Sequence, residues 1–90
     1  MIAVILDGEK LRSDADVHDI LSRAFNFPPY YGRNLDALWD CLTEFCEPIC
    51  VRFINYDSAA EHLGGFAAGL KALFEDAQNA IAHFSFEIGA

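Results

Sequence analysis

Residues 30–43 read YYGRNLDALWDCLT, and this stretch determines more of the expected architecture than any other part of the chain. Asn34 is a favoured N-cap residue and follows the turn residue Gly32, so a helix is expected from about Leu35 to Phe45. Three leucines recur at helical spacing within it: Leu35, Leu38 and Leu42. This spacing predicts a helix with one apolar face in the core.

The same helix would carry an acidic face. Asp36 and Asp40 are four residues apart and so share one side, with Trp39 beside them. Like charges at that spacing weaken a helix by roughly 0.2–0.5 kcal/mol, and no Lys or Arg lies three or four residues from Asp40 to offset this. Asp36 gains from the positive helix N-terminus, whereas Asp40 lies beyond the first turn. An acidic stripe flanked by aromatic residues is typical of a surface that binds something positively charged.

The length and charge of the chain limit its class. Its 90 residues predict a single domain, 1–90, and a hydrophobic fraction of 53% is enough for a packed core. Fourteen acidic residues against six basic ones give a net charge of −8, which argues against direct binding of nucleic acid because phosphates would be repelled. The charge fits a basic protein partner, or simply a soluble cytosolic protein.

The apolar runs and the cysteines favour a cytoplasmic protein. No apolar run approaches the ~20 residues that span a bilayer. The start, MIAVILD, has no basic region and turns acidic at once, so we do not expect a signal peptide. Cys41, Cys46 and Cys50 stand beside apolar residues, and their odd number suggests buried thiols in a reducing compartment. Their spacing, with no His nearby, is a poor zinc pattern.

Three segments read as strands. Ile2–Leu6 is a continuous apolar run, as expected of a strand that is buried on both faces. Ile49–Ile54 is a β-branched and aromatic run that follows Pro48. From residue 83 to residue 88, polar and apolar residues alternate, which predicts a half-exposed strand.

Four segments read as helices. Apolar residues at helical spacing cover 17–25, 35–45 and 66–81. Ser13 with Asp16 resembles a capping box ahead of the first of these. A second capping box, Ser58 with Glu61, predicts the start of a short helix that Gly64-Gly65 would end.

The expected order of elements is therefore β-α-α-β-α-α-β. Helical crossovers between strands imply a parallel sheet. Three strands cannot carry many helices on both faces, so two layers are expected. The sequence thus predicts an α/β fold: a small two-layer domain with a three-stranded parallel sheet packed against helices.

Several kinds of chemistry could use the acidic face. Asp36 and Asp40 could be a catalytic carboxylate pair, but a convex helix surface on a small chain offers little cleft. They could bind a divalent cation, although no third ligand is spaced to join them, or they could be a solvated face without a role. The aromatic residues favour a protein interface, because Tyr30, Tyr31 and Trp39 are of the types enriched at binding hot spots. Tyr31 could instead cover the core.

The histidines give no sign of catalysis. His18 is expected on the polar side of the first helix, His62 near a helix end, and His83 on the exposed face of the last strand. No Ser or Cys is spaced toward them as a nucleophile would be. We therefore expect three solvated histidines, no enzymatic activity and no cofactor.

Residues 28–43, PPYYGRNLDALWDCLT, closely resemble the central motif of the barstar family of intracellular ribonuclease inhibitors. Weaker similarity covers AVI at 3–5, GE at 8–9, RS at 12–13 and FEDA at 74–77. The expected β-α-α-β-α-α-β order agrees with the family's fold. The resemblance implies that the second helix and the loop before it bind the active site of a basic, extracellular-type ribonuclease that is barnase-like and guanyl-preferring.

By motif position, the resemblance implies partner-binding roles for Tyr30, Gly32, Asn34, Asp36, Trp39, Asp40, Thr43, Phe45 and Asp76. Asp40 would be the central anchor, its carboxylate lying where the enzyme holds a substrate phosphate. A ribonuclease that binds phosphodiesters presents Arg, Lys and His, and an acidic helix offers carboxylates to the same donors. Opposite charge also speeds the encounter.

The chain departs from the family pattern at Pro29, Arg33, Glu44, Phe45 and Asp76. Phe45 stands where the family has tryptophan, and Asp76 is one methylene shorter than the glutamate it matches. Arg33 replaces an acid and puts a positive charge beside the expected interface. It could pair with Asp36, or it could indicate a different partner.

Two hypotheses follow. The first is an intracellular inhibitor of a barnase-like ribonuclease, monomeric when free, without contact to nucleic acid or membrane. The alternative is a regulatory module with the barstar fold that binds another basic protein or a divalent metal.

Overall fold

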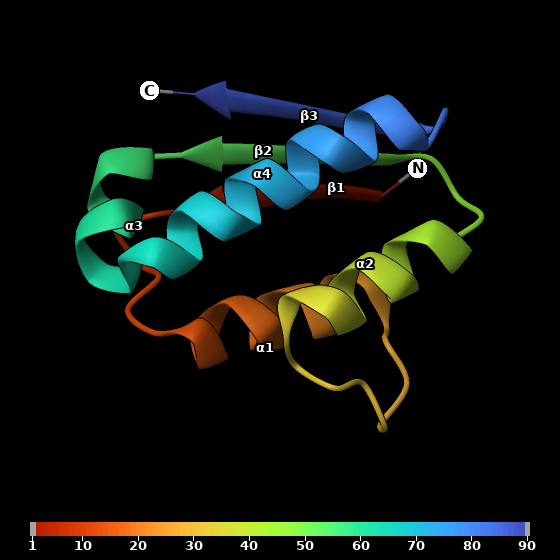
Figure 1. The fold of residues 1–90 in the computed structure, drawn as a ribbon, viewed down its shortest axis with the longest axis horizontal. Coiled ribbons are helices and arrows are strands. Elements are labelled where there is room, and N and C mark those ends of the chain that lie inside the picture. The colour runs from red at the N-terminus through yellow and green to blue at the C-terminus, as the bar shows by residue number, and fades with distance from the viewer. Residues whose placement is uncertain (1, 90) are drawn as a thin grey trace.

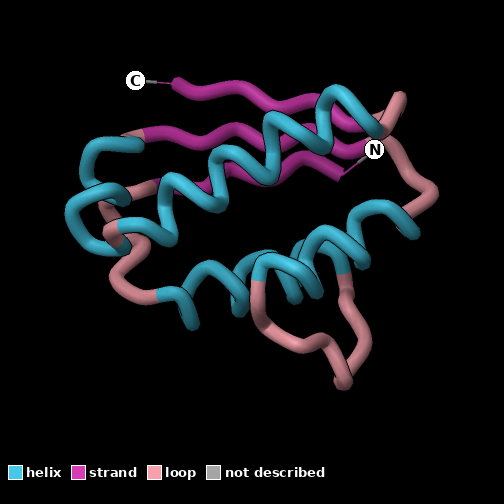
Figure 2. Tube along the Cα trace, in the orientation of Figure 1, coloured by secondary structure: helices cyan, strands magenta, loops and turns pink. Residues whose placement is uncertain are grey.

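The computed structural model describes residues 2–89 and has the expected order of elements (Figure 1). These are β1 (Ile2–Asp7), α1 (Asp14–Phe25), α2 (Leu35–Glu44), β2 (Ile49–Ile54), α3 (Tyr56–Leu63), α4 (Gly65–Ala80) and β3 (Phe84–Gly89). The strands form one sheet in the order β1-β2-β3 (Figure 2), and both pairs are parallel. Ile2, Ile49 and Phe84 lie side by side in the register. The predicted α/β class and parallel sheet are confirmed.

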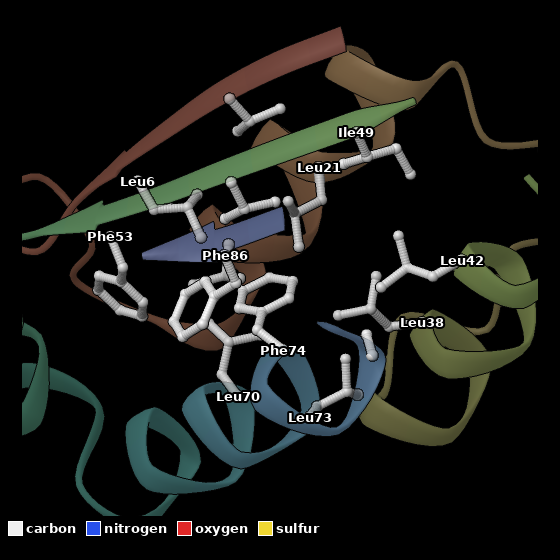
Figure 3. Packing of buried hydrophobic residues seen from close by; sticks show 14 of the residues in the cluster. Leu6, Leu21, Leu38, Leu42, Ile49, Phe53, Leu70, Leu73, Phe74 and Phe86 are labelled. Atoms are coloured by element: carbon white, nitrogen blue, oxygen red, sulfur yellow. The ribbon is translucent and has the colours of Figure 1, made fainter. Parts of the chain in front are cut away.

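The core lies between one face of the sheet and the helices (Figure 3). Alternate residues of each strand enter it, as Val4 and Leu6 do from β1. Ile5, between them, is 62% exposed. The prediction that Ile2–Leu6 is buried on both faces is therefore wrong. An uninterrupted apolar run does not reveal that the helices cover only one face of so narrow a sheet.

The first helix begins as expected, and the third does not. Ser13 caps α1 by accepting a 3.4 Å hydrogen bond from the amide of Asp16. The predicted capping box at Ser58 is wrong, because α3 starts at Tyr56 and its N-cap is Asn55, three residues before Ser58. Asn55 adopts the left-handed conformation with φ 53°, and its side-chain amide donates to the Asp7 carboxylate at 2.8 Å. β2 thus turns directly into α3, which leaves no room for the expected cap.

The cysteines are less buried than expected. Cys46 is exposed in the turn after α2, and Cys41 and Cys50 are partly buried. The prediction of three buried thiols is wrong, because an apolar neighbour in sequence does not share the side of its element: successive residues alternate across a strand and are about 100° apart around a helix. Burial, with a smaller effect from Glu44 and then Asp40, raises the pKa of the Cys41 thiol.

None of the helices within residues 2–89 has the length and apolarity needed to cross a membrane.

Candidate protein-binding site

The start of α2 is fixed by Asn34. Its backbone is extended, with φ −144°, and its side-chain oxygen accepts a 2.8 Å hydrogen bond from the amide of Ala37. Its side-chain nitrogen donates to the carbonyl of Gly32 at 3.3 Å. The predicted N-cap is confirmed, and the helix ends at Glu44 because the backbone of Phe45 is extended.

α2 divides into an apolar and an acidic side. Leu38 and Leu42 are fully buried, whereas Asp36, Asp40 and Glu44 are exposed. Within residues 2–89, none of these three carboxylates forms an ion pair. The last turn of the helix contains no basic residue. The helix therefore presents uncompensated negative charge to solvent.

A shallow depression of about 250 Å³ lies between α2 and α4. Asp36, Trp39 and Asp76 are among its lining residues, so the fold brings the predicted residue of α4 beside those of α2. A Cβ added to Gly69 would lie 2.9 Å from Leu35 Cδ1. Glycine at this position therefore leaves room for the end of the Leu35 side chain between the two helices, a contact that the sequence did not predict.

A second depression of about 300 Å³ lies where the preceding loop meets α2, and Tyr30, Gly32, Asp40 and Glu44 contribute to its lining. The two tyrosines of the loop have different environments. Tyr30 is 86% exposed, whereas Tyr31 is 9% exposed and belongs to the core. Burial raises the pKa of Tyr31 to about 12. Of the two interpretations left open for Tyr31, covering the core is the one that its position supports.

The other predicted residues make local contacts. Asn34 serves as the cap, and Thr43 donates to the carbonyl of Asp40 at 2.9 Å. The ring of Phe45 packs edge-on against that of Phe25, with 5.6 Å between the ring centroids, and Phe45 is half-buried. Of the remaining predicted residues, Trp39 is half-buried and the others are exposed: Tyr30, Gly32, Asp36, Asp40 and Asp76. A binding role for any of the nine stays a prediction.

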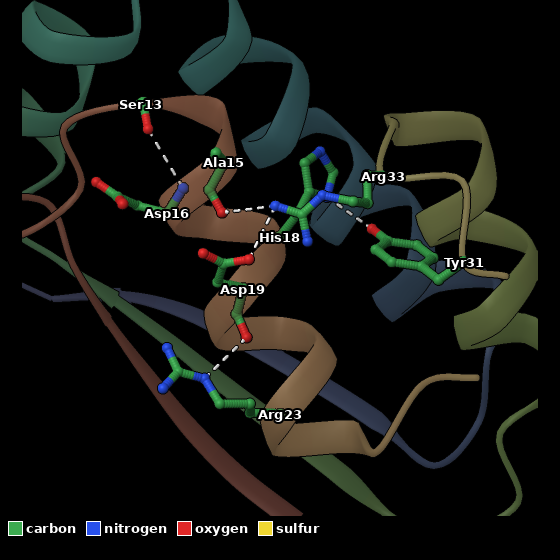
Figure 4. A network of polar contacts seen from close by, with 8 residues as sticks. All are labelled: Ser13, Ala15, Asp16, His18, Asp19, Arg23, Tyr31 and Arg33. Carbon is green, nitrogen blue, oxygen red and sulfur yellow. Dashed lines mark hydrogen bonds and ion pairs between the residues drawn. The ribbon is translucent and has the colours of Figure 1, made fainter. Parts of the chain in front are cut away.

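Arg33 does not pair with Asp36. Its guanidinium turns back to α1, where it forms a 2.8 Å ion pair with Asp19 and donates to the carbonyl of Ala15 at 3.2 Å (Figure 4). The sequence could not reveal this contact, because the two residues come from different elements.

The prediction that His18 lies on the polar side of the first helix is wrong. His18 is 3% exposed, and its Nδ1 shares a 2.7 Å hydrogen bond with the Tyr31 hydroxyl. Burial, and then the charge of Arg33, lowers the pKa of His18. The signal was present, because His18 precedes Leu21 and Phe25 by three and seven residues, the spacing of a buried face.

The other histidines also have partners. His62 is exposed, but its Nδ1 lies 3.1 Å from the carbonyl oxygen of Leu11. His83 lies in the turn before β3 rather than on the strand, is half-buried, and donates from Nε2 to the carbonyl of Phe45 at 2.8 Å. The expectation of fully solvated side chains is therefore wrong for His83 and incomplete for His62.

No metal centre is present in the described part of the chain: nowhere in residues 2–89 do three or more His, Cys, Asp or Glu side chains come together.

The comparison with known families gives a direct answer. The model of the family described as Barstar (barnase inhibitor) matches residues 1–89. This chain belongs to the barstar family. It is also 38% identical over 79 residues to a Bacillus subtilis (strain 168) protein named "Putative ribonuclease inhibitor YrdF", and the match covers 87% of each chain. Both findings confirm the resemblance seen in residues 28–43, and the observed fold is barstar-like.

Proposed function

We propose that this protein is a non-catalytic inhibitor of a basic, barnase-like ribonuclease, whose active site it blocks with α2 and the preceding loop. Membership of the barstar family and the similarity to YrdF support a ribonuclease-inhibitor-like role. The observation that carries the proposal is the row of exposed carboxylates on α2: Asp36, Asp40 and Glu44 have no ion-pair partner within residues 2–89.

The proposed mechanism is substitution for the phosphates of RNA. A ribonuclease cleft presents Arg, Lys and His side chains, and carboxylates form short, charge-assisted hydrogen bonds with them. Asp40, on the middle of the acidic side, would be the central anchor. The depression lined by Asp36, Trp39 and Asp76 suits a second cationic side chain, whose stem could lie on the indole. Tyr30, 86% exposed, would add aromatic contact at the edge.

Charge should also govern the rate of encounter. The net charge of −8 attracts a basic partner over a distance comparable to the Debye length, ~8–10 Å at physiological salt. We expect added salt to slow association strongly and dissociation weakly. An association rate that does not change between low and high salt would contradict this steering.

We further propose that residues 1–90 act as one domain, that the protein is monomeric when free, and that it works in the cytoplasm without a cofactor. A role in binding another basic protein uses the same acidic surface and is distinguished by the experiment below. No observation within residues 2–89 favours the metal-binding alternative.

The direct test is titration of the protein into an RNA cleavage assay with barnase. We expect about one equivalent to abolish cleavage, the protein alone to leave RNA intact, and Asp40→Asn to lose most of the inhibition. Glu61→Gln is a matched control, because it removes the same charge from an exposed position on α3. Undiminished cleavage by barnase and by other basic secreted ribonucleases at excess protein would contradict the proposal.

A further inference from the structure

The loop between α1 and α2, residues 26–34, is held by contacts to α1. This loop carries Tyr30, Gly32 and Asn34 of the proposed inhibitory surface. Tyr31 reaches inward to His18, and Arg33 reaches back over the first turns of α1 (Figure 4). The loop is therefore fastened at two positions that alternate with the three residues expected to meet the partner.

The guanidinium of Arg33 binds two acceptors on α1. One terminal nitrogen of the guanidinium lies 2.8 Å from the Asp19 carboxylate and 3.2 Å from the carbonyl oxygen of Ala15. It thus joins a charged side chain and a backbone carbonyl of the same helix. Asp19 and Arg33 are each about half exposed, at 52% and 45% of their side chains, so the pair is not held by burial alone.

The backbone at Arg33 also requires explanation. Its φ is 54°, in the left-handed region that residues other than glycine seldom adopt. Such a conformation persists where the surroundings hold it in place. The next residue, Asn34, is the N-cap of α2, so the contacts of Arg33 fix the point at which the loop enters the helix.

The ion pair with Asp19 also determines where the positive charge of Arg33 lies. Arg33 shares a depression of about 350 Å³ with Asp14, Asn34 and Asp36, so an unpaired guanidinium could reach the acidic surface. Its contact with Asp19 holds it toward α1 instead.

We propose that Arg33 is a positioning residue. Its contacts with Asp19 and Ala15 order the 26–34 loop in the free protein, and they hold the positive charge of Arg33 away from the acidic surface that the partner binds. This inference rests on the proposed function, since it concerns the same surface. An ordered loop loses less conformational freedom on binding, which strengthens affinity without any direct contact.

The first experiment is a double-mutant cycle with barnase as the probe. Arg33→Gln and Asp19→Asn change the net charge in opposite directions, yet both break the pair. We expect each single variant to weaken binding by about twofold to fivefold, the range of an exposed ion pair. Because both variants lose the same contact, the double variant should also bind about twofold to fivefold more weakly than wild type, and not by the sum of the two losses. Arg33→Lys, which keeps the charge, should recover part of the loss.

Arg23→Gln is the matched control. Arg23 lies on α1, and within residues 2–89 the one hydrogen bond of its side chain is to the carbonyl of Asp19 in the same helix, at 3.3 Å. This variant therefore has the same net charge as Arg33→Gln but keeps the contacts that hold the loop. A purely structural role would lower stability toward urea and leave the affinity of the folded protein unchanged. Tighter binding by Arg33→Gln, as expected if Arg33 merely repels a basic partner, would overturn the proposal.

The second experiment needs no ribonuclease. The amide of Tyr31 donates to the carbonyl of Pro28 at 3.0 Å inside the loop, and its hydrogen exchange reports loop order. We expect severalfold faster exchange in Arg33→Gln and in Asp19→Asn, with β2 amides and Arg23→Gln unchanged. Unaltered Tyr31 exchange would overturn the inference even if barnase is inhibited. Failure of the wild-type protein to inhibit barnase would instead contradict the proposed function, and exchange would still decide whether Arg33 orders the loop.

Discussion

The two helices that follow β1 are built alike but use their carboxylates differently. Each begins at a polar N-cap, Ser13 or Asn34, and buries one apolar side. In α1, Asp16 accepts a 3.0 Å hydrogen bond from the amide of Arg12, and Asp19 pairs with Arg33. In α2, the exposed carboxylates have no such partner within residues 2–89.

This difference separates charges that serve the fold from charges that do not. Asp16 of α1 satisfies a backbone donor, Asp19 fastens the neighbouring loop, and Arg23 lies in the last turn of the helix. Like charges on α2 slightly oppose the helix that carries them. Residues kept against local preference are expected at functional surfaces. The comparison therefore predicts that α1 and α2 respond differently to the loss of a carboxylate.

The inner sides of the two helices should behave alike. Leu21 of α1 and Leu42 of α2 are both fully buried. We predict that replacement of either by Ala lowers the free energy of unfolding by about 2–5 kcal/mol, because each leaves a cavity. Urea denaturation measures the effect. A loss below about 1 kcal/mol for Leu42→Ala alone would mean that α2 is not anchored in the core as α1 is.

Acidification should lower the folding stability through His18 of α1. The pKa of His18 is lowered in the folded protein by burial and then by Arg33, so below about pH 6.5 the unfolded chain binds more protons than the folded one. This contribution to stability is complete above pH 6.5 and is lost as pH falls, at up to about 1.4 kcal/mol per pH unit. Urea denaturation between pH 7 and pH 5.5 should show a steeper decline for wild type than for His18→Gln. Equal slopes would contradict the assigned role of His18.

Loss of a carboxylate should destabilise α1 more than α2. Asp16→Ala removes an acceptor at the helix start and should lower the free energy of unfolding by about 1 kcal/mol, as the loss of a cap does. Asp36→Ala loses a favourable position at the N-terminus of α2 but also relieves repulsion from Asp40, so we expect a net change of a few tenths of a kcal/mol. Thermal or urea unfolding of both variants gives the comparison, and equal losses would remove the distinction between the helices.

The sequence predicted the order of elements because each carries its own local signal. The strands have β-branched or alternating runs, the helices have apolar spacing, and Asn34 is a strong cap for α2. The errors arise where a residue's environment comes from another element. His18 is buried by Tyr31 from the following loop, and Asn55, at the start of α3, binds Asp7 of β1 with its side chain.

The candidate site shows the same limit. The acidic side of α2 follows from spacing alone, since Asp36 and Asp40 lie four residues apart. That Asp76 joins them came only from the family resemblance, because it depends on how α4 packs beside α2. The partner of Arg33 was likewise outside the reach of spacing, because Asp19 lies on a different helix.

The central claim is that the acidic side of α2 is kept for binding rather than for stability, and Asp40→Ala tests it most directly. Both the affinity for barnase and the free energy of unfolding should be measured on this variant. We predict that binding weakens by more than about 2 kcal/mol, roughly thirtyfold, while the free energy of unfolding is unchanged or rises by a few tenths of a kcal/mol. Normal binding, or loss of the folded state, would contradict the claim.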